Sequence, residues 1–366
     1  MCEGGLTAVT EATIIEALLA FLQRQDTTEE DFDRLALSVF AYQFEHNQPY
    51  RRFAIQRGRT TLTVRHWRDI PAVPITAFKD LTLSCRPAND IPHVFMTSGT
   101  TRAVRGRSYH PTLAVYDLSM ILNFRQRFMR GQERIRMGIL FPDEVAMPNS
   151  SLAHYLALAL REFGMPDSAV MIGDAGLDMD RLMAALAQAE ASGEPYALLG
   201  ASYSFVHLID ELRRQGRSFR LPDGSRILDT GGFKGQSREV GADDFYDSLS
   251  ETLGVPRSLC INMYGMTELS TQFYDSGNEA CPPVKSGPHW IRSRVVDPLT
   301  GQDVAEGATG VLVHHDLAHF NSVSAILTED AGVVVPGGFQ LLGRVDGADS
   351  KGCSLAVEEF LRAARG

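Results

Sequence analysis

The segment Thr97-Ser98-Gly99-Thr100-Thr101 surrounds one glycine with four hydroxyl side chains. Glycine permits a tight turn and a close approach of the backbone, while hydroxyl and N–H groups can donate to phosphate oxygens. Three arginines that could neutralise a polyphosphate follow, namely Arg102, Arg105 and Arg107. The Gly-Lys-Ser/Thr ending of a Walker loop is absent, so a polar turn at a sheet edge is an equally good interpretation of this segment alone.

The segment Tyr264-Gly265-Met266-Thr267-Glu268 places a hydroxyl next to a carboxylate. A lone carboxylate repels phosphate groups unless a cation lies between them, and Mg²⁺ is a hard cation that binds both kinds of oxygen. Glu268 is therefore a candidate Mg²⁺ ligand. The alternative is that Glu268 opens a following helix and interacts with its dipole, which is worth roughly 0.3–1 kcal/mol.

Two further segments combine small or acidic residues after apolar runs. Gly231-Gly232-Phe233-Lys234 comes shortly after the run 226–228, and Thr328-Glu329-Asp330 follows the run 323–327. Asp330 could accept hydrogen bonds from ribose hydroxyls, as acidic residues do in dinucleotide-binding folds. The alternative for Asp330 is a solvated turn.

The elements that must position these residues are short apolar runs that alternate with longer amphipathic stretches. We expect strands at 93–96, 137–141, 169–172, 196–199, 226–228 and 259–262, with helices such as 113–128 and 152–163 between them. This alternation predicts an α/β fold with a mostly parallel sheet covered by helices. Ligands of such sheets gather outside the carboxyl ends of the strands, so the segments 97–101, 200–204, 229–234 and 263–268 are expected to converge there.

The pattern changes along the chain and predicts four parts. Strands are expected at 290–296, 310–315, 323–327 and 339–342, and a last short helix at 355–362. The predicted parts are a helical N-terminal segment (1–90), an α/β nucleotide-binding core (91–283), a β-rich subdomain (284–343), and a hinge with a short C-terminal tail (344–366). Three histidines of the β-rich part could suggest a metal site, but a polar strand end is the favoured interpretation of His314, His315 and His319.

Composition excludes several classes of function. The 366 residues carry a formal net charge of −10, and no block of basic residues alternates with aromatics, which argues against a nucleic-acid partner. No apolar stretch reaches the ~18 residues of a membrane span. The first ten residues lack the basic start of a signal peptide. Five scattered cysteines without a C-x-x-C pair argue against disulfides or zinc and predict a cytoplasmic protein.

The order of these motifs resembles the adenylate-forming superfamily of acyl-CoA synthetases, adenylation domains and firefly luciferase. Within it, the chain looks most like the acyl-protein synthetase (LuxE-type) family over roughly residues 30–366. The segments 229–234, 328–330, Gly343-Arg344 and Gly352-Cys353-Ser354-Leu355 carry that closer likeness. The resemblance implies the N-terminal domain fold of the superfamily without its large C-terminal lid domain.

The resemblance also implies roles for individual residues. Ser98, Thr100 and Thr101 would hold the β- and γ-phosphates of ATP in a loop that includes Gly99 and Arg105. Gly231, Gly232 and Phe233 would sandwich the adenine, and Asp330 and Arg344 would hold the ribose. In the signature segment that starts at Tyr264, Gly265 and Met266, Thr267 would contact the α-phosphate and Glu268 would bind Mg²⁺. The lid domain of the larger superfamily members carries a catalytic lysine, and Lys234 is the candidate to replace it in this chain. Tyr203 and Phe205 are candidates for the acyl pocket.

The predicted function is ATP-dependent activation of a carboxylic acid to an acyl-adenylate, followed by transfer to a thiol. The thiol could be Cys353, a carrier protein, a partner enzyme or coenzyme A. Cys353 lies close to Lys351, and a nearby cation favours the reactive thiolate. The alternative for Cys353 is a small buried residue that opens the final helix. Two other functions stay open: an amide-forming acyl ligase with an amine acceptor, and a nucleotide-binding partner subunit without turnover.

Overall fold

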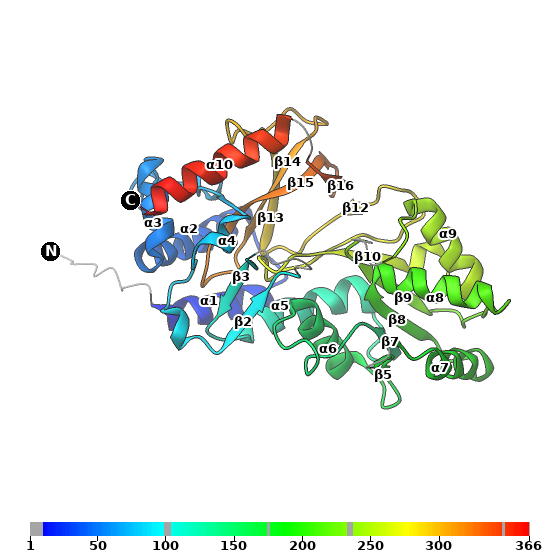
Figure 1. Cartoon of the computed structure of the whole chain (residues 1–366). Coiled ribbons are helices and arrows are strands. Elements are labelled where there is room, and N and C mark those ends of the chain that lie inside the picture. Colours follow the sequence, from blue (N-terminus) through cyan, green and yellow to red (C-terminus); the bar gives the residue numbers. More distant parts are fainter. Residues whose placement is uncertain (1–9, 99–103, 174–175, 233–236, 346–347, 366) are drawn as a thin grey trace.

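The protein is built around two sheets that lie next to each other, each with its own set of helices (Figure 1). The computed structural model describes residues 10–98, 104–173, 176–232, 237–345 and 348–365, and the side chains of 348–353 and 365 are outside the description. The N-terminal helices and the C-terminal helix lie with the antiparallel sheet at one end of the molecule, and the helices between residues 179 and 253 lie at the other end (Figure 1). Many of the candidate site residues lie on or next to strands of these two sheets, whereas Ser98 and Arg105 lie next to a separate two-stranded hairpin and Cys353 lies in the C-terminal helix.

The first sheet is the mostly parallel sheet that the sequence predicts. Its strands follow the order β11-β10-β9-β8-β4-β5, in which neighbours from β10 to β5 are parallel and β11 is antiparallel to β10. The strands are β4 (Arg136–Leu140), β5 (Ala169–Val170), β8 (Tyr196–Ala201), β9 (Arg226–Thr230), β10 (Cys260–Tyr264) and β11 (Phe273–Tyr274). All six residues of β8 are buried, as expected of a central strand with helices on both faces.

Helices cover both faces of this sheet because successive strand residues point to opposite sides. On β8, Leu198 packs with residues of α7, α8 and α9, whereas Leu199 packs with residues of α5 and α6. The helices are α5 (Ala114–Phe124, continued by a π-helical turn Arg125–Met129), α6 (Ser151–Phe163), α7 (Met179–Ser192), α8 (Ser202–Arg214) and α9 (Ala242–Leu253). The Ser150 side chain caps α6 by accepting from the Ala153 N–H.

The second sheet is the β-rich part, and it is antiparallel apart from one short strand. Its order is β12-β16-β15-β14-β13, with β1 parallel to β15. The strands are β1 (Val73–Pro74), β12 (Val284–Lys285), β13 (Ile291–Val296), β14 (Gly310–Asp316), β15 (Ala325–Val335) and β16 (Gly338–Arg344). It shares one hydrophobic core with the helices α1 (Glu11–Gln23), α2 (Glu29–His46), α3 (Gln48–Gln56), α4 (Ala77–Asp80) and α10 (Ala348–Arg365).

The run 93–96 is a strand, but its expected place in the parallel sheet is wrong. It forms β2 (His93–Met96), which pairs in an antiparallel hairpin with β3 (Arg107–His110). The predicted strand 169–172 is also divided, between β5 and the small hairpin of β6 (Ile172–Gly173) and β7 (Gly176–Leu177). Local apolar patterning identifies a strand, but it does not identify the partner with which the strand pairs.

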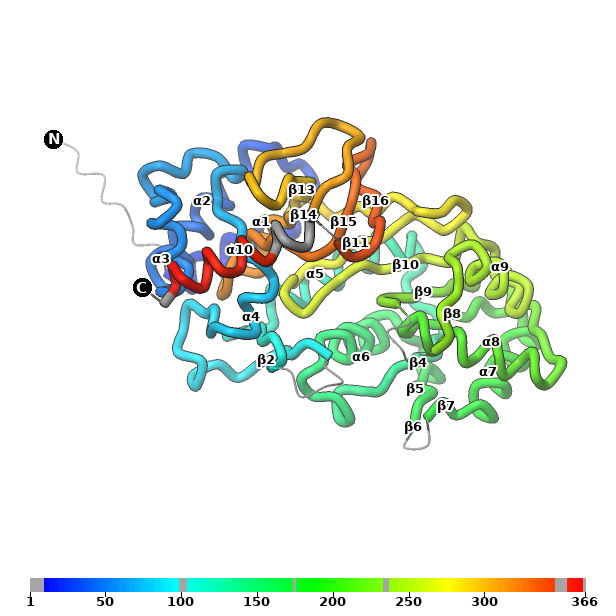
Figure 2. The backbone as a smooth tube through the Cα atoms, turned by 45° about the horizontal axis from the view of Figure 1, so that its top comes forward, coloured from blue at the N-terminus to red at the C-terminus, as the bar shows by residue number. Residues whose placement is uncertain are grey.

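The chain ends in a longer helix than the sequence predicts. The expected helix covers 355–362, whereas α10 covers Ala348–Arg365 and runs along α3 (Figure 2). The rings of Phe53 and Phe360 lie 4.6 Å apart, and Arg57 donates two hydrogen bonds to Glu359. These contacts dock the end of the chain on the N-terminal helices. Across the described part of the chain, no helix has the length and apolarity needed to cross a bilayer.

Candidate active site

The predicted phosphate loop is closed at its base by two hydrogen bonds. The Thr97 N–H donates to the Gly106 carbonyl at 3.0 Å, and the Gly106 N–H donates to the Thr97 hydroxyl oxygen at 3.0 Å. The loop therefore connects the strands of a hairpin and does not follow a strand of the parallel sheet. Ser98 and Arg105 are exposed at its two ends. Gly99, Thr100 and Thr101 lie outside the described residues.

The carboxylate of Glu268 lies against the base of this loop. Glu268 is buried, and a Cβ atom added at Gly106 would lie 3.0 Å from Oε1 of Glu268 and 3.2 Å from Cγ2 of Thr97. A larger residue at position 106 would therefore require the carboxylate to shift by a few tenths of an ångström. The structure thus brings together two motifs that are about 160 residues apart in the sequence.

The segment around Glu268 is a turn between two strands, and no helix begins there. The Leu269 N–H donates to the Met266 carbonyl, and the chain continues into β11 at Phe273. The alternative role for Glu268 at a helix N-terminus is therefore wrong. Thr267 precedes Glu268 in this turn and is partly exposed.

Asp316, at the end of β14, holds the chain just beyond Glu268. It is fully buried, and it accepts hydrogen bonds from the N–H groups of Ser270, Thr271 and Ala318 and from the Thr271 hydroxyl, at 2.7–3.0 Å. Burial raises the pKa of Asp316 to about 6, although these donors act in the opposite direction. The second sheet therefore fixes the backbone that carries Glu268.

Tyr264 connects the signature segment to the predicted ribose site. Its hydroxyl donates to Oδ2 of Asp330 at 2.8 Å, and Nε of Arg344 lies 3.3 Å from Oδ1 of the same carboxylate. Asp330 and Arg344 are direct partners across β15 and β16. Burial, followed by the Asp330 charge, raises the pKa of Tyr264 well above its usual value, so the hydroxyl keeps its proton. Asp330 is consequently oriented from two sides.

The three histidines each have a different partner within the protein. His314 shares a hydrogen bond with the Ser293 hydroxyl at 2.8 Å and lies 3.4 Å from the Tyr264 hydroxyl. The ring of His315 packs edge-on against the ring of Trp67. His319 forms a hydrogen bond with the Ser270 hydroxyl. Burial lowers the pKa of His314 and of His319 to about 3. The described residues contain no group of three or more His, Cys, Asp or Glu side chains arranged for a metal ion.

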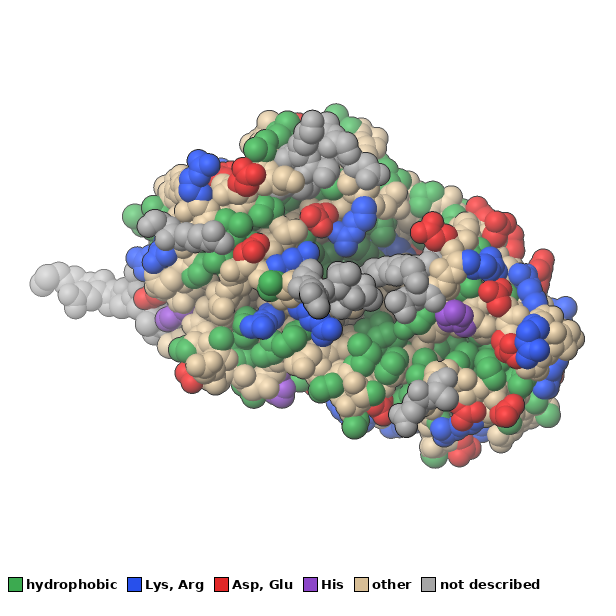
Figure 3. All heavy atoms as spheres, in the orientation of Figure 1, with side chains coloured by type: hydrophobic (Ala, Val, Ile, Leu, Met, Phe, Trp, Pro, Cys, Tyr) green, Lys and Arg blue, Asp and Glu red, His purple; other side chains and the backbone are tan. Residues whose placement is uncertain are grey.

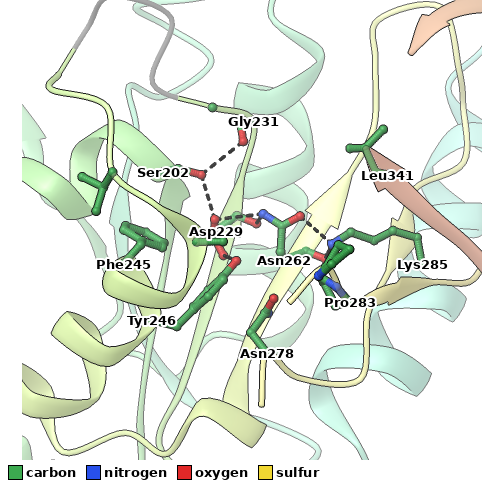
Figure 4. A pocket seen from close by; sticks show the side chains of 14 residues that line it. Ser202, Asp229, Gly231, Phe245, Tyr246, Asn262, Asn278, Pro283, Lys285 and Leu341 are labelled. Carbon is green, nitrogen blue, oxygen red and sulfur yellow. Dashed lines mark hydrogen bonds between the residues drawn. The ribbon is translucent and has the colours of Figure 1, made fainter. Parts of the chain in front are cut away.

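A pocket of about 240 Å³ opens where Gly231 and Gly232 follow β9 (Figure 4). Gly231 has a φ of +77°, a conformation that favours glycine. Apolar walls come from α9 and its preceding loop, from the prolines before β12 and from Leu341 of β16, and the lining includes Val240, Ala242, Phe245, Pro282 and Pro283. Phe233 and Lys234 lie outside the described residues.

Buried polar side chains form the floor of the pocket. Asp229, on β9, accepts hydrogen bonds from the Ser202 hydroxyl at 2.7 Å, the Tyr246 hydroxyl at 3.1 Å and the Asn262 amide at 2.9 Å. Burial raises the pKa of Asp229. Lys285, from β12 of the other sheet, reaches this floor and contacts Asn262. Residues of both sheets therefore line the pocket.

Sequence reasoning missed several residues of this arrangement. Asp229 and Asn262 are polar residues at the ends of otherwise apolar strand runs, and this position could have indicated that they belong to the site. Gly106, Asp316 and Lys285 carried no such signal, because their partners are remote in the sequence. Of the residues expected in the acyl pocket, Phe205 belongs to α8 and is fully buried in the hydrophobic core that α7, α8 and α9 share with the first sheet.

The remaining predicted residues are placed as follows. Tyr203 packs at the edge of the core on the α5 and α6 side of the sheet. Gly265 is exposed and Met266 is half-buried next to the second core. Cys353 lies within the α10 backbone and does not open the helix, and its side chain is not described.

On the face displayed in Figure 3, basic side chains gather near the centre of the molecule, which suits an anionic ligand.

Comparison with known proteins gives the same fold. An open-conformation crystal structure of 2-hydroxyisobutyryl-CoA ligase, in complex with 2-HIB-AMP and CoA, aligns with a TM-score of 0.64 at 17% identity, covering 87% of this chain and 76% of that one. ATP-bound MatB from Rhodopseudomonas palustris aligns with a TM-score of 0.50 at 18% identity, covering 71% and 49%. The adenylate-forming fold expected from the sequence is confirmed.

Sequence comparison identifies the family. A protein named long-chain-fatty-acid--luciferin-component ligase from Vibrio harveyi is 25% identical over 342 residues, covering 90% of this chain and 88% of its own length. The protein of the same name from Aliivibrio fischeri is 24% identical over 344 residues, with the same coverage. The model of the family described as "Acyl-protein synthetase, LuxE" matches residues 8–362. The chain therefore belongs to the LuxE acyl-protein synthetase family and is an ATP-dependent ligase that activates a carboxylic acid and transfers the acyl group.

Proposed function

We propose that one ATP molecule binds across the two sheets, with its base in the pocket beside Gly231 and Gly232. The observation that supports this proposal best is the convergence of Glu268 with the loop base and of Tyr264 with the Asp330–Arg344 pair. The pocket of about 240 Å³ is smaller than the roughly 300–1,000 Å³ of sites for drug-sized ligands, so it suits a nucleobase and not a whole nucleotide. Asp330 would then accept hydrogen bonds from the ribose hydroxyls.

The first step joins two anions and needs their charges neutralised. A carboxylate oxygen of the substrate attacks the α-phosphorus, the bond from this phosphorus to the bridging oxygen breaks, and pyrophosphate leaves with that oxygen. Glu268 suits Mg²⁺, which commonly uses one or two carboxylates together with substrate phosphates and would neutralise charge there. Thr267 would contact the α-phosphate. Ser98, Arg105 and the loop N–H groups would hold the β- and γ-phosphates.

The second step transfers the acyl group from the mixed anhydride to a nucleophile. A thiolate attacks the acyl carbon, the bond to the AMP oxygen breaks, and a thioester forms while AMP leaves. Cys353 on α10 is our candidate for this thiolate, and a carrier protein or coenzyme A would take its place otherwise. The names of the two bacterial relatives make long-chain fatty acids the first substrate class to test.

A panel of carboxylic acids, including long-chain fatty acids, tests the first step. With ATP, Mg²⁺ and hydroxylamine, we expect pyrophosphate release and an acyl hydroxamate for at least one acid. The hydroxamate identifies the acid, because hydroxylamine traps the activated acyl group. Binding of ATP without pyrophosphate release for any acid would contradict the proposal and favour a nucleotide-binding subunit.

Replacing Cys353 with serine separates the two steps. If Cys353 is the acceptor, the variant releases pyrophosphate normally but forms no acyl-enzyme from a radiolabelled acid, because a serine hydroxyl is a far weaker nucleophile than a thiolate. Cys281→Ser is the matched control, since Cys281 is only half-buried and should leave labelling intact. Normal labelling of the Cys353→Ser protein would exclude this acceptor, and transfer to added amines would then favour amide formation.

Replacing Asp330 with alanine is expected to raise the KM for ATP by about 10- to 100-fold, the cost of one or two hydrogen bonds to a charged group. The KM for the acid should change little, because Asp330 is assigned to the ribose. Glu329→Gln is the control, since Glu329 also contacts Arg344, at 3.2 Å, but is not assigned to the nucleotide. Initial rates at varied ATP concentrations decide the matter, and equal effects of both variants would count against a ribose contact.

A further inference from the structure

Lys285 is a buried lysine whose hydrogen-bonding capacity is fully used by the protein. Its side chain is 3% exposed. It donates to the Asn262 carbonyl at 2.8 Å, to Oδ1 of Asn262 at 2.5 Å and to Oδ2 of Asp275 at 2.7 Å. An ammonium group has three N–H donors, so none is left for a ligand. Lys285 lines the pocket, but it can influence a ligand only through its partners.

Asp275 neutralises Lys285 and is itself held in place. Its side chain is fully buried, and its oxygens also accept hydrogen bonds from the N–H groups of Asn262 and Gly277 and from the Asn278 amide. A buried ion pair with additional donors on its carboxylate has a single favourable geometry. The ammonium of Lys285 is therefore fixed relative to the backbone of β10.

This arrangement determines the orientation of the Asn262 amide. Lys285 can only donate, so the atom that faces it must be the amide oxygen (Figure 4). The amide nitrogen then faces the carboxylate of Asp229 at 2.9 Å and its carbonyl at 3.3 Å, which are both acceptors. The reverse orientation would place two donors together on one side and two acceptors together on the other.

The fixed amide makes the pocket floor a hydrogen-bond acceptor. The hydroxyls of Ser202 and Tyr246 donate to Asp229, and the donors of Asn262 and Lys285 are also satisfied within the protein. The oxygens of Asp229 and Asn262 therefore set the polarity of the floor. Such a floor favours an amino group of a ligand and disfavours a carbonyl oxygen, because two facing acceptors repel each other.

We propose that Lys285 is a positioning residue that sets the base selectivity of the nucleotide pocket by fixing the Asn262 amide above Asp229. The inference rests on the proposed function, in which this pocket receives the base of ATP. The floor would accept a hydrogen bond from the amino group of adenine and reject the carbonyl group that guanine carries at the same ring position. Without Lys285, the Asn262 oxygen loses the donor that faces it, and the amide is held from one side only, by the two acceptors of Asp229.

The test compares equilibrium binding of ATP and GTP, each with Mg²⁺, to the full-length protein by calorimetry. We expect the wild type to bind ATP at least about tenfold more tightly than GTP, and Lys285→Met to lower this ratio by about tenfold, the scale of one hydrogen bond. Lys285→Met leaves Asp275 buried without its counter-ion, so the double variant Lys285→Met/Asp275→Asn, which removes both charges, is measured alongside. Lys285→Arg keeps the charge and the donors and should retain most of the selectivity.

Arg226→Met is the matched control for loss of a buried cation. Arg226 lies at the opposite end of β9 and donates to the carbonyls of Phe128 and Met129 at 2.7 and 2.8 Å. This variant should lose stability but keep the wild-type selectivity. A selectivity ratio unchanged in the double variant, or lowered equally by Arg226→Met, would overturn the role of Lys285. Failure of the wild type to bind ATP or release pyrophosphate would instead overturn the proposed function.

Discussion

Replacement of Glu268 with glutamine is expected to lower the rate of pyrophosphate release by about 10²–10³-fold, the usual effect of removing one group that stabilises transition-state charge. Glutamine has nearly the same shape as glutamate, so the buried site beside Gly106 should still pack. It lacks the negative charge that a divalent cation requires. Initial rates measured over a range of Mg²⁺ concentrations should show a weaker dependence on Mg²⁺ in the variant.

Two further variants make this experiment specific. Glu306→Gln alters an exposed glutamate and should leave the rate unchanged. Gly106→Ala places a methyl carbon 3.0 Å from Oε1 of Glu268, so it should shift the carboxylate by a few tenths of an ångström and lower the rate less than Glu268→Gln does. A Glu268→Gln protein that releases pyrophosphate at the wild-type rate would exclude Glu268 as the metal ligand.

Replacement of Asp316 with alanine is expected to lower the free energy of unfolding by about 4 kcal/mol at neutral pH. The change leaves three buried N–H groups and the Thr271 hydroxyl without their acceptor. Asp316→Asn should cost less, because one oxygen remains and the new amide can donate to the Thr271 hydroxyl. Urea denaturation measures both, and Asp303→Asn, at a half-exposed carboxylate, should change stability by less than about 1 kcal/mol.

The raised pKa of Asp316 also predicts the sign of a pH dependence. Its carboxyl titrates at about 6 in the folded protein, compared with 3.8 for an ordinary aspartate, so the folded state binds more protons between these values. The stability of the wild type relative to Asp316→Asn should therefore fall as the pH rises from about 4 to 6, by at most about 1.4 kcal/mol per pH unit, and stay constant above. A difference that rises over this range would contradict the assignment.

The sequence by itself determined the class of fold and most of the motifs. Apolar runs of three to five residues separated by amphipathic helices predict a covered parallel sheet, and β4, β8, β9 and β10 form one. The glycine and hydroxyl segments taken alone left a polar turn as an equally good interpretation, and the resemblance to the adenylate-forming superfamily supplied the prediction of a nucleotide site. The pairing of Asp330 with Arg344 could be predicted from the sequence, because consecutive strands such as β15 and β16 commonly pair with each other.

Only the tertiary structure decided which segments meet. The hairpin of β2 and β3 brings Gly106 to Glu268, β12 carries Lys285 across to β10, and β14 places Asp316 under the turn after Glu268. Each contact joins residues that have no periodic relation in the chain. Such contacts are fixed by the simultaneous burial of two sheets, and local patterns do not encode how those sheets pack. The sequence shows which residue types are present, whereas the packing of the folded core determines which hydrogen-bond partners they have.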